Sequence, residues 1–124
     1  MAKPRPLSPH LQVYDMLRIT SLTSILHRLT GAALVIGTLI IVWWLMAVAH
    51  GPQAYADFNH TIQSWYFKLA LVGFTWAFWY HFINGIRHLF WDAGIGFDHN
   101  TFPVTGKLAL IASVIATIAT WWVL

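Results

Sequence analysis

The stretch LTGAALVIGTLIIVWWLMAVA, Leu29 to Ala49, decides what kind of fold this chain adopts, because its 21 residues carry no charged side chain. A helix needs about 20 apolar residues to cross a hydrocarbon core of about 30 Å. Inside lipid the backbone must satisfy its own hydrogen bonds, and a helix does this within one segment. The stretch therefore predicts a transmembrane helix over residues 29–49.

The composition of the whole chain agrees with a membrane protein. Of 124 residues, 58% are apolar and only 9% are charged, whereas roughly a quarter of a soluble domain is charged. We expect residues 1–124 to form a single membrane domain. The sequence has no cysteine, which excludes disulfides, iron–sulfur clusters and covalent CxxCH haem attachment.

Two further apolar runs, at about residues 66–91 and 104–124, predict a second and a third span. The expected fold is all-α, an integral membrane protein with three transmembrane helices. The polar segment 1–28 lacks the apolar core of a signal peptide. Its proline-rich part, RPLSPHLQVY, should be extended. A helical stretch follows, with Ser21 or Ser24 as the expected N-cap of the first long helix.

The distribution of basic residues predicts an orientation. Four of them precede the first span, and two more flank the second loop: Lys3, Arg5, Arg18 and Arg28, then Arg87 and Lys107. The first loop has no Lys or Arg before Lys68, which is the one exception to the pattern. Because loops rich in Lys and Arg stay inside, the N-terminus and the second loop should face the cytoplasm.

One histidine, His81, lies deep within the second predicted span. It falls about 15 Å from the boundary at Trp91, where an ionisable side chain is costly. The imidazole could hydrogen-bond across a helix interface, ligate haem iron, or relay protons in a small transporter. The absence of carboxylates within the spans argues against a relay. Gly85 shares the face of His81 and His88, so a flat ligand or another helix could approach closely there.

The other histidines constrain any haem site. All six lie at span boundaries or in loops: His10, His27, His50, His60, His88 and His99. A second histidine ligand deep in the membrane would then have to come from another chain. The sequence therefore predicts a heteromeric helix bundle.

A polar cluster is expected at the inner boundary. Ser24, His27 and Arg28 share one helical face, on the same side of the membrane as Arg87 and His88. Each arginine alone could be a topology anchor in contact with water or lipid phosphate. Together the hydroxyl, imidazoles and guanidiniums could bind a quinone carbonyl or neutralise haem propionates.

Three motifs carry a resemblance to a known family: RPLSPHLQVY at the N-terminus, SILHRLTG from residue 24, and HFINGIRHLFWD from residue 81. Together with the three-span pattern, they resemble the cytochrome b membrane-anchor subunits of succinate dehydrogenase, respiratory complex II. The likeness covers nearly the whole chain and is to the alphaproteobacterial and mitochondrial branch.

The resemblance implies roles for particular residues. It makes His81 an axial ligand of haem b, with a histidine of a second anchor subunit as the other ligand. It places Ser24, Ile25 and Arg28 at the ubiquinone site. His27 and Arg28 would lie near the haem propionates, and His88 would contact the haem pocket in a role that the resemblance does not define.

The resemblance also implies a function. The chain would anchor a flavoprotein and an iron–sulfur subunit and form part of the site where electrons from succinate reduce ubiquinone. It would not bind succinate or nucleic acid. We expect it in the bacterial inner membrane, in preference to the mitochondrial one. The alternatives are a small transporter or proton-relay protein, and a haem-free structural anchor.

Overall fold

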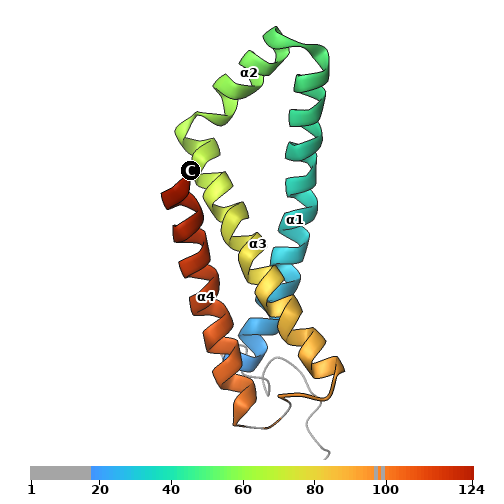
Figure 1. The fold of residues 1–124 in the computed structure, drawn as a ribbon, viewed down its shortest axis with the longest axis vertical. Helices are drawn as coiled ribbons and strands as arrows, with labels where there is room; N and C mark the ends of the chain where they lie inside the picture. The colour runs from blue at the N-terminus through green and yellow to red at the C-terminus, as the bar shows by residue number, and fades with distance from the viewer. Residues whose placement is uncertain (1–17, 97, 99) are drawn as a thin grey trace, which may run out of the picture.

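A computed structural model of the chain describes residues 18–96, 98 and 100–124. Those residues form four α-helices (Figure 1): α1 (Ile19–His50), α2 (Pro52–Ile62), α3 (Trp65–Asp92) and α4 (Thr101–Val123). The expected all-α fold is confirmed for the part of the chain that the structure describes. The extended conformation predicted for RPLSPHLQVY concerns residues outside that part.

The three long helices run alternately up and down (Figure 1). Helix α1 crosses α3 near the end where α1 begins, and the two diverge toward α2, while α4 lies along α3. The start of α1, the end of α3 and the start of α4 therefore lie at one end of the bundle. That arrangement brings the polar residues of the predicted inner boundary together.

Helices α1 and α4 are, among the described helices, the two that are long and apolar enough to cross a membrane. Helix α3 has 28 residues, about 42 Å at 1.5 Å per residue, so its length suffices. Its polar residues, which include Lys68, His81 and Arg87, lower its hydropathy. The three predicted spans fall within α1, α3 and α4 apart from the final residue, and the role of α3 as a span stays a prediction.

The start of α1 differs from the expectation. The helix begins at Ile19, with Arg18 as its N-cap and no capping bond from a side chain. Ser21 and Ser24 lie inside the helix, so the prediction that either one caps it is wrong. Because α1 has 32 residues, about 48 Å, it extends well beyond the 29–49 span. The first turns of α1 thus carry the SILHRLTG motif on a rigid helix.

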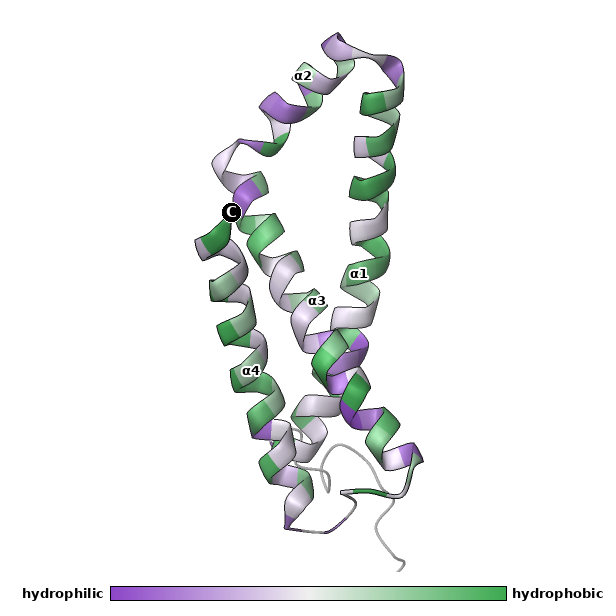
Figure 2. Ribbon diagram, viewed as in Figure 1, coloured by the Kyte–Doolittle hydropathy of each residue, from purple (hydrophilic) through white to green (hydrophobic). Residues whose placement is uncertain are grey.

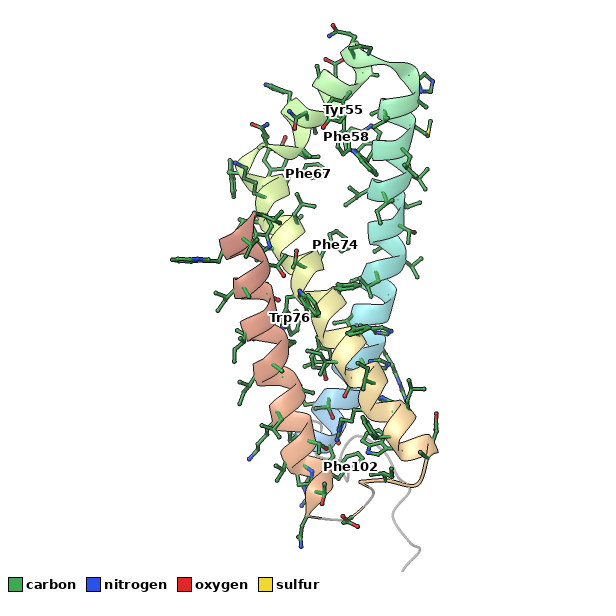
Figure 3. The ribbon with its side chains drawn as sticks, viewed as in Figure 1. Tyr55, Phe58, Phe67, Phe74, Trp76 and Phe102 are labelled. Carbon is green, nitrogen blue, oxygen red and sulfur yellow. The ribbon has the colours of Figure 1, made fainter. Side chains whose placement is uncertain are left out.

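The segment between the first two predicted spans is largely helical, where a loop was expected. Gly51, at φ 102°, ends α1, and Pro52 begins α2 at a position where its fixed φ suits a helix. Phe58 anchors α2: it is 5% exposed and packs edge-on against Trp43 at 4.7 Å. Figure 3 shows Phe58 and Phe67 beneath α2, toward the gap between α1 and α3.

Many of the buried side chains in the described residues are polar or small, while many large apolar side chains are exposed. Figure 2 shows hydrophilic residues gathered where α1 crosses α3 and hydrophobic residues along much of the long helices. The buried polar or charged residues are Ser21, Thr23, Thr30, Asn84, Arg87, Ser113 and Thr117. Many large apolar side chains are instead exposed, for example Val35 at 68% and Ile118 at 62%. Such continuous apolar exposure fits a lipid or protein neighbour and not water.

Helix α4 packs through small residues at helical spacing, namely Gly106, Ala109, Ser113 and Thr117, all of which are buried. Small side chains let helix backbones approach closely in membranes. Two indole groups add hydrogen bonds between α3 and α4. The Trp79 Nε1–H donates to Thr120 Oγ1 at 2.9 Å, and the Trp121 Nε1–H donates to Thr75 Oγ1 at 3.2 Å.

Arg87 fastens the end of α3 to the start of α4. Its guanidinium donates to Thr105 Oγ1 at 2.9 Å, to the Phe102 carbonyl at 2.7 Å and to Asn84 Oδ1 at 3.2 Å. It also lies over the rings of Trp91 and Phe102, at 4.2 and 4.6 Å. The side chain is 8% exposed. Arg87 is therefore a structural residue, and the alternative that it is a solvated topology anchor is wrong.

This packing predicts that Arg87→Lys destabilises the bundle. A lysine ammonium cannot reproduce the planar, divergent set of donors and the stacking, so buried acceptors lose partners at about 1–3 kcal/mol each. Thermal unfolding of the purified protein should show the loss. Lys107→Arg, the reverse exchange at an exposed site, should stay within about 0.5 kcal/mol of wild type. Equal stability of both variants would contradict the assigned role.

Candidate haem and quinone site

The polar residues of the predicted inner boundary meet where α1 crosses α3. Nδ1 of His81 lies 3.1 Å from the backbone oxygen of His27 and 3.3 Å from Thr30 Oγ1. Because a carbonyl oxygen can only accept, Nδ1 carries the hydrogen and donates it. Nε2 then holds the lone pair of the neutral imidazole. In metal-binding histidines, one ring nitrogen usually donates a hydrogen bond that orients the ring, and the other nitrogen binds the metal. His81 has this arrangement, with Nε2 as the free nitrogen.

Three imidazole rings form a column at the crossing. The His27 ring stacks on the His81 ring, with centroids 4.0 Å apart and planes 5° apart. The His27 ring also stacks on the His88 ring, with centroids 4.8 Å apart and planes 21° apart. His88 is itself held, because its Nδ1 lies 2.7 Å from the Asn84 carbonyl and its ring contacts Trp91 edge-on at 4.6 Å. The structure therefore unites the three histidines that the sequence singled out.

Two polar atoms at this crossing are buried without a partner in the described structure: His27 Nδ1 and Asn84 Nδ2. Each such atom carries a desolvation cost. The His27 ring is therefore kept in the column by stacking against its neighbours and not by a bond from Nδ1.

The residues expected to serve a quinone lie on α1 beside this column. Ser24 and Arg28 are exposed and Ile25 is half-buried. Ser24 and Arg28 are four residues apart and so share a flank of the helix. By helix geometry, Gly31 lies on the same flank of α1, at an angle around the helix axis between that of His27 and that of Ser24 and Arg28. The structure thus keeps Ser24 and Arg28 accessible while Arg87, once grouped with them, is engaged by α4.

The open face of α3 flanks His81. Phe78 and Phe82 are 48% and 50% exposed and stack with centroids 6.0 Å apart. A Cβ added at Gly85 would meet nothing within 4 Å. A face that is apolar, aromatic and locally bare suits a flat porphyrin, and His81 adds a nitrogen donor at its edge. The residues present therefore fit a haem.

Sequence reasoning missed two neighbours of His81. The Thr30 hydroxyl lies within hydrogen-bonding distance of the His81 Nδ1. Gly31 lies so near the His81 ring that an added Cβ would be 3.0 Å from Cε1. Both belong to the SILHRLTG motif, and their places three and four residues after His27 put them on its helical face. That spacing was the signal available in the sequence.

Comparisons with known proteins show the family to which the chain belongs. Residues 1–120 match the family model described as succinate dehydrogenase/fumarate reductase transmembrane subunit. The chain is 43% identical over 116 residues to the succinate dehydrogenase cytochrome b556 subunit of Paracoccus denitrificans, covering 94% of this chain and 88% of that protein. It is 41% identical over 117 residues to the cytochrome b556 subunit of Rickettsia felis, covering 94% and 90%.

A relative of lower identity belongs to the same group of proteins. The succinate dehydrogenase cytochrome b560 subunit of Reclinomonas americana is 32% identical over 122 residues, covering 94% of this chain and 84% of that protein. The resemblance predicted from the three sequence motifs is confirmed: the chain belongs to the family of succinate dehydrogenase/fumarate reductase transmembrane subunits.

Proposed function

We propose that this chain is the haem b-binding membrane anchor of a succinate:ubiquinone oxidoreductase. The observation that carries the proposal is the tether on His81, whose Nδ1 is bound to the His27 carbonyl so that Nε2 is left as the metal-binding nitrogen. Its relatives are named as cytochrome b subunits of succinate dehydrogenase, which supports the same conclusion.

His81 would hold the iron of haem b together with a histidine of a second anchor subunit. When bound, the haem would supply a one-electron carrier near the quinone. His27 would support the His81 ring by stacking. Arg28, His27 and His88 are the candidates to neutralise the propionates, since they lie at the inner end of the same crossing.

Ser24, Ile25 and Arg28 would serve the quinone. The Ser24 hydroxyl would donate to a carbonyl oxygen, and the Arg28 guanidinium would stabilise the negative charge that develops on reduction. Ile25 would provide an apolar wall. The exposure of Ser24 and Arg28 in the single chain supports this role, because a quinone must enter from lipid.

The partners of the proposed complex are a second anchor, an iron–sulfur subunit and a flavoprotein. This chain would contribute no succinate chemistry. Its exposed apolar faces support burial in lipid and against the second anchor. We infer a bacterial inner-membrane location with a cytoplasmic N-terminus. The alternative of a proton-relay transporter has no support in the family match, and the haem-free anchor is tested below.

The first test concerns haem binding. His81→Ala in the assembled complex should abolish the native reduced-minus-oxidised haem b spectrum, because iron loses its ligand from this chain. His60→Ala, on exposed α2 at the other end of the bundle, is the matched control and should retain it. A wild-type spectrum in His81→Ala would refute the assignment, and a haem-free wild-type complex would favour the structural anchor.

The second test concerns the quinone. Ser24→Ala should lower succinate–ubiquinone reductase activity by about 10²–10³-fold, the scale seen when one donor to a developing oxyanion is removed. Succinate oxidation with an artificial acceptor that draws electrons upstream should persist. Ser64→Ala, whose hydroxyl bonds the Thr61 carbonyl at the opposite end, should leave both activities unchanged. Near-normal quinone turnover in Ser24→Ala would remove Ser24 from the site.

The third test concerns orientation. The sequence has no cysteine, so single cysteines report cleanly. Gln53→Cys on α2 should react with a membrane-impermeant thiol reagent on spheroplasts, and Asn100→Cys before α4 should react only after permeabilisation. Both positions are exposed in the chain. Labelling in the reverse pattern would overturn the proposed topology.

A further inference from the structure

The ring of His81 lies against the bare backbone of Gly31. A Cβ added at position 31 would lie 3.0 Å from Cε1, 3.5 Å from Nδ1 and 3.9 Å from Nε2 of that ring. Ordinary contacts between carbon atoms are about 3.5–4.0 Å. Any larger residue at position 31 would therefore require the imidazole or the helix backbone to move by a few tenths of an ångström.

Gly31 also leaves the hydrogen-bond acceptor of His81 accessible. It follows His27 by four residues, and in a helix each Cα–Cβ bond tilts toward the N-terminus. A side chain at position 31 would thus project over the turn that carries the His27 carbonyl. That carbonyl is the acceptor for His81 Nδ1, at 3.1 Å. A glycine at this position keeps the path between the two atoms open.

We propose that Gly31 is a positioning residue for the haem ligand, which it serves by fixing the ring plane of His81 and the direction of its Nε2. The inference rests on the proposed function. Two interactions hold the ring, namely the bond from Nδ1 to the His27 carbonyl and the stack on the His27 ring at 4.0 Å, and the missing Cβ of Gly31 leaves the space in which the ring edge lies. Only glycine leaves this space open, because every other residue type would place a Cβ there.

The chain offers a matched control in the same helix. A Cβ at Gly37 would lie 3.0 Å from Cε1 and 3.1 Å from Cδ1 of Phe74 on α3, so the steric conflict there is at least as close as that at Gly31. Both glycines lie inside α1, so alanine raises helix propensity equally at both. Phe74 borders a cavity of about 540 Å³ between α1 and α3, and its ring points into that gap (Figure 3). It lies almost two helical turns from His81 on α3.

The test compares Gly31→Ala with Gly37→Ala in the assembled, haem-loaded complex. The EPR signal of oxidised low-spin haem depends on the orientation of the ligand imidazole planes. Gly31→Ala should shift the highest g value beyond the line width or lower the haem content per complex. Gly37→Ala should retain the wild-type signal and haem content. Wild-type signals in both variants, with the haem still lost in His81→Ala, would overturn this inference and leave the proposed function intact.

A second comparison covers the case in which Gly31→Ala fails to assemble. If the methyl group is intolerable because it strikes the His81 ring, the double variant Gly31→Ala/His81→Ala should be as thermally stable as His81→Ala alone. That equality would support the inference. An equal loss of stability from Gly31→Ala in both backgrounds would show that the methyl group strikes something else, and would refute it.

Discussion

The hydrogen bond from Nδ1 of His81 to the carbonyl of His27 is the contact on which the site depends. It joins α1 to α3 where they cross, and it decides which imidazole nitrogen is free. A histidine with both nitrogens available can bind metal in two orientations, whereas this one has a single direction left. The SILHRLTG motif supplies the carbonyl, the stacking ring and the glycine, and the HFINGIRHLFWD motif supplies His81, the proposed ligand. Two segments about fifty residues apart thus form one site.

Burial of polar groups is the second organising constraint. In lipid, apolar side chains gain little by packing against each other, and small or polar residues hold helices together instead. The described interior follows that rule: Thr23, Ser113 and Asn84 are almost wholly buried, while large aliphatic side chains point outward. Arg87 is the extreme case. Its charge is tolerated because three oxygen acceptors and two aromatic rings surround it.

The sequence was most informative where a physical requirement is strong. Apolar runs identified the regions of α1 and α4, and the lone mid-span histidine identified the crossing. It was least informative where tertiary contacts decide. Helix α2 lies where a loop was expected: Gly51-Pro52 is typical of a helix end, yet the same Pro52 begins the next helix. Ser21 and Ser24 were expected to cap the helix because serine favours the N-cap position. A helix capped by Ser21 would begin at Leu22, but α1 begins three residues earlier, at Ile19. Arg87 looked equivalent to Arg28 until its acceptors on α4 were visible, since no periodicity reveals a partner from another helix.

The most direct measurement of the central claim is a cryo-electron microscopy structure of the whole complex purified with its haem. The account predicts iron bound to Nε2 of His81, Nδ1 of the same ring still within hydrogen-bonding distance of the His27 carbonyl, and the ring edge against Gly31. Iron bound to His27 or His88, or a His81 ring turned away from the His27 carbonyl, would contradict it.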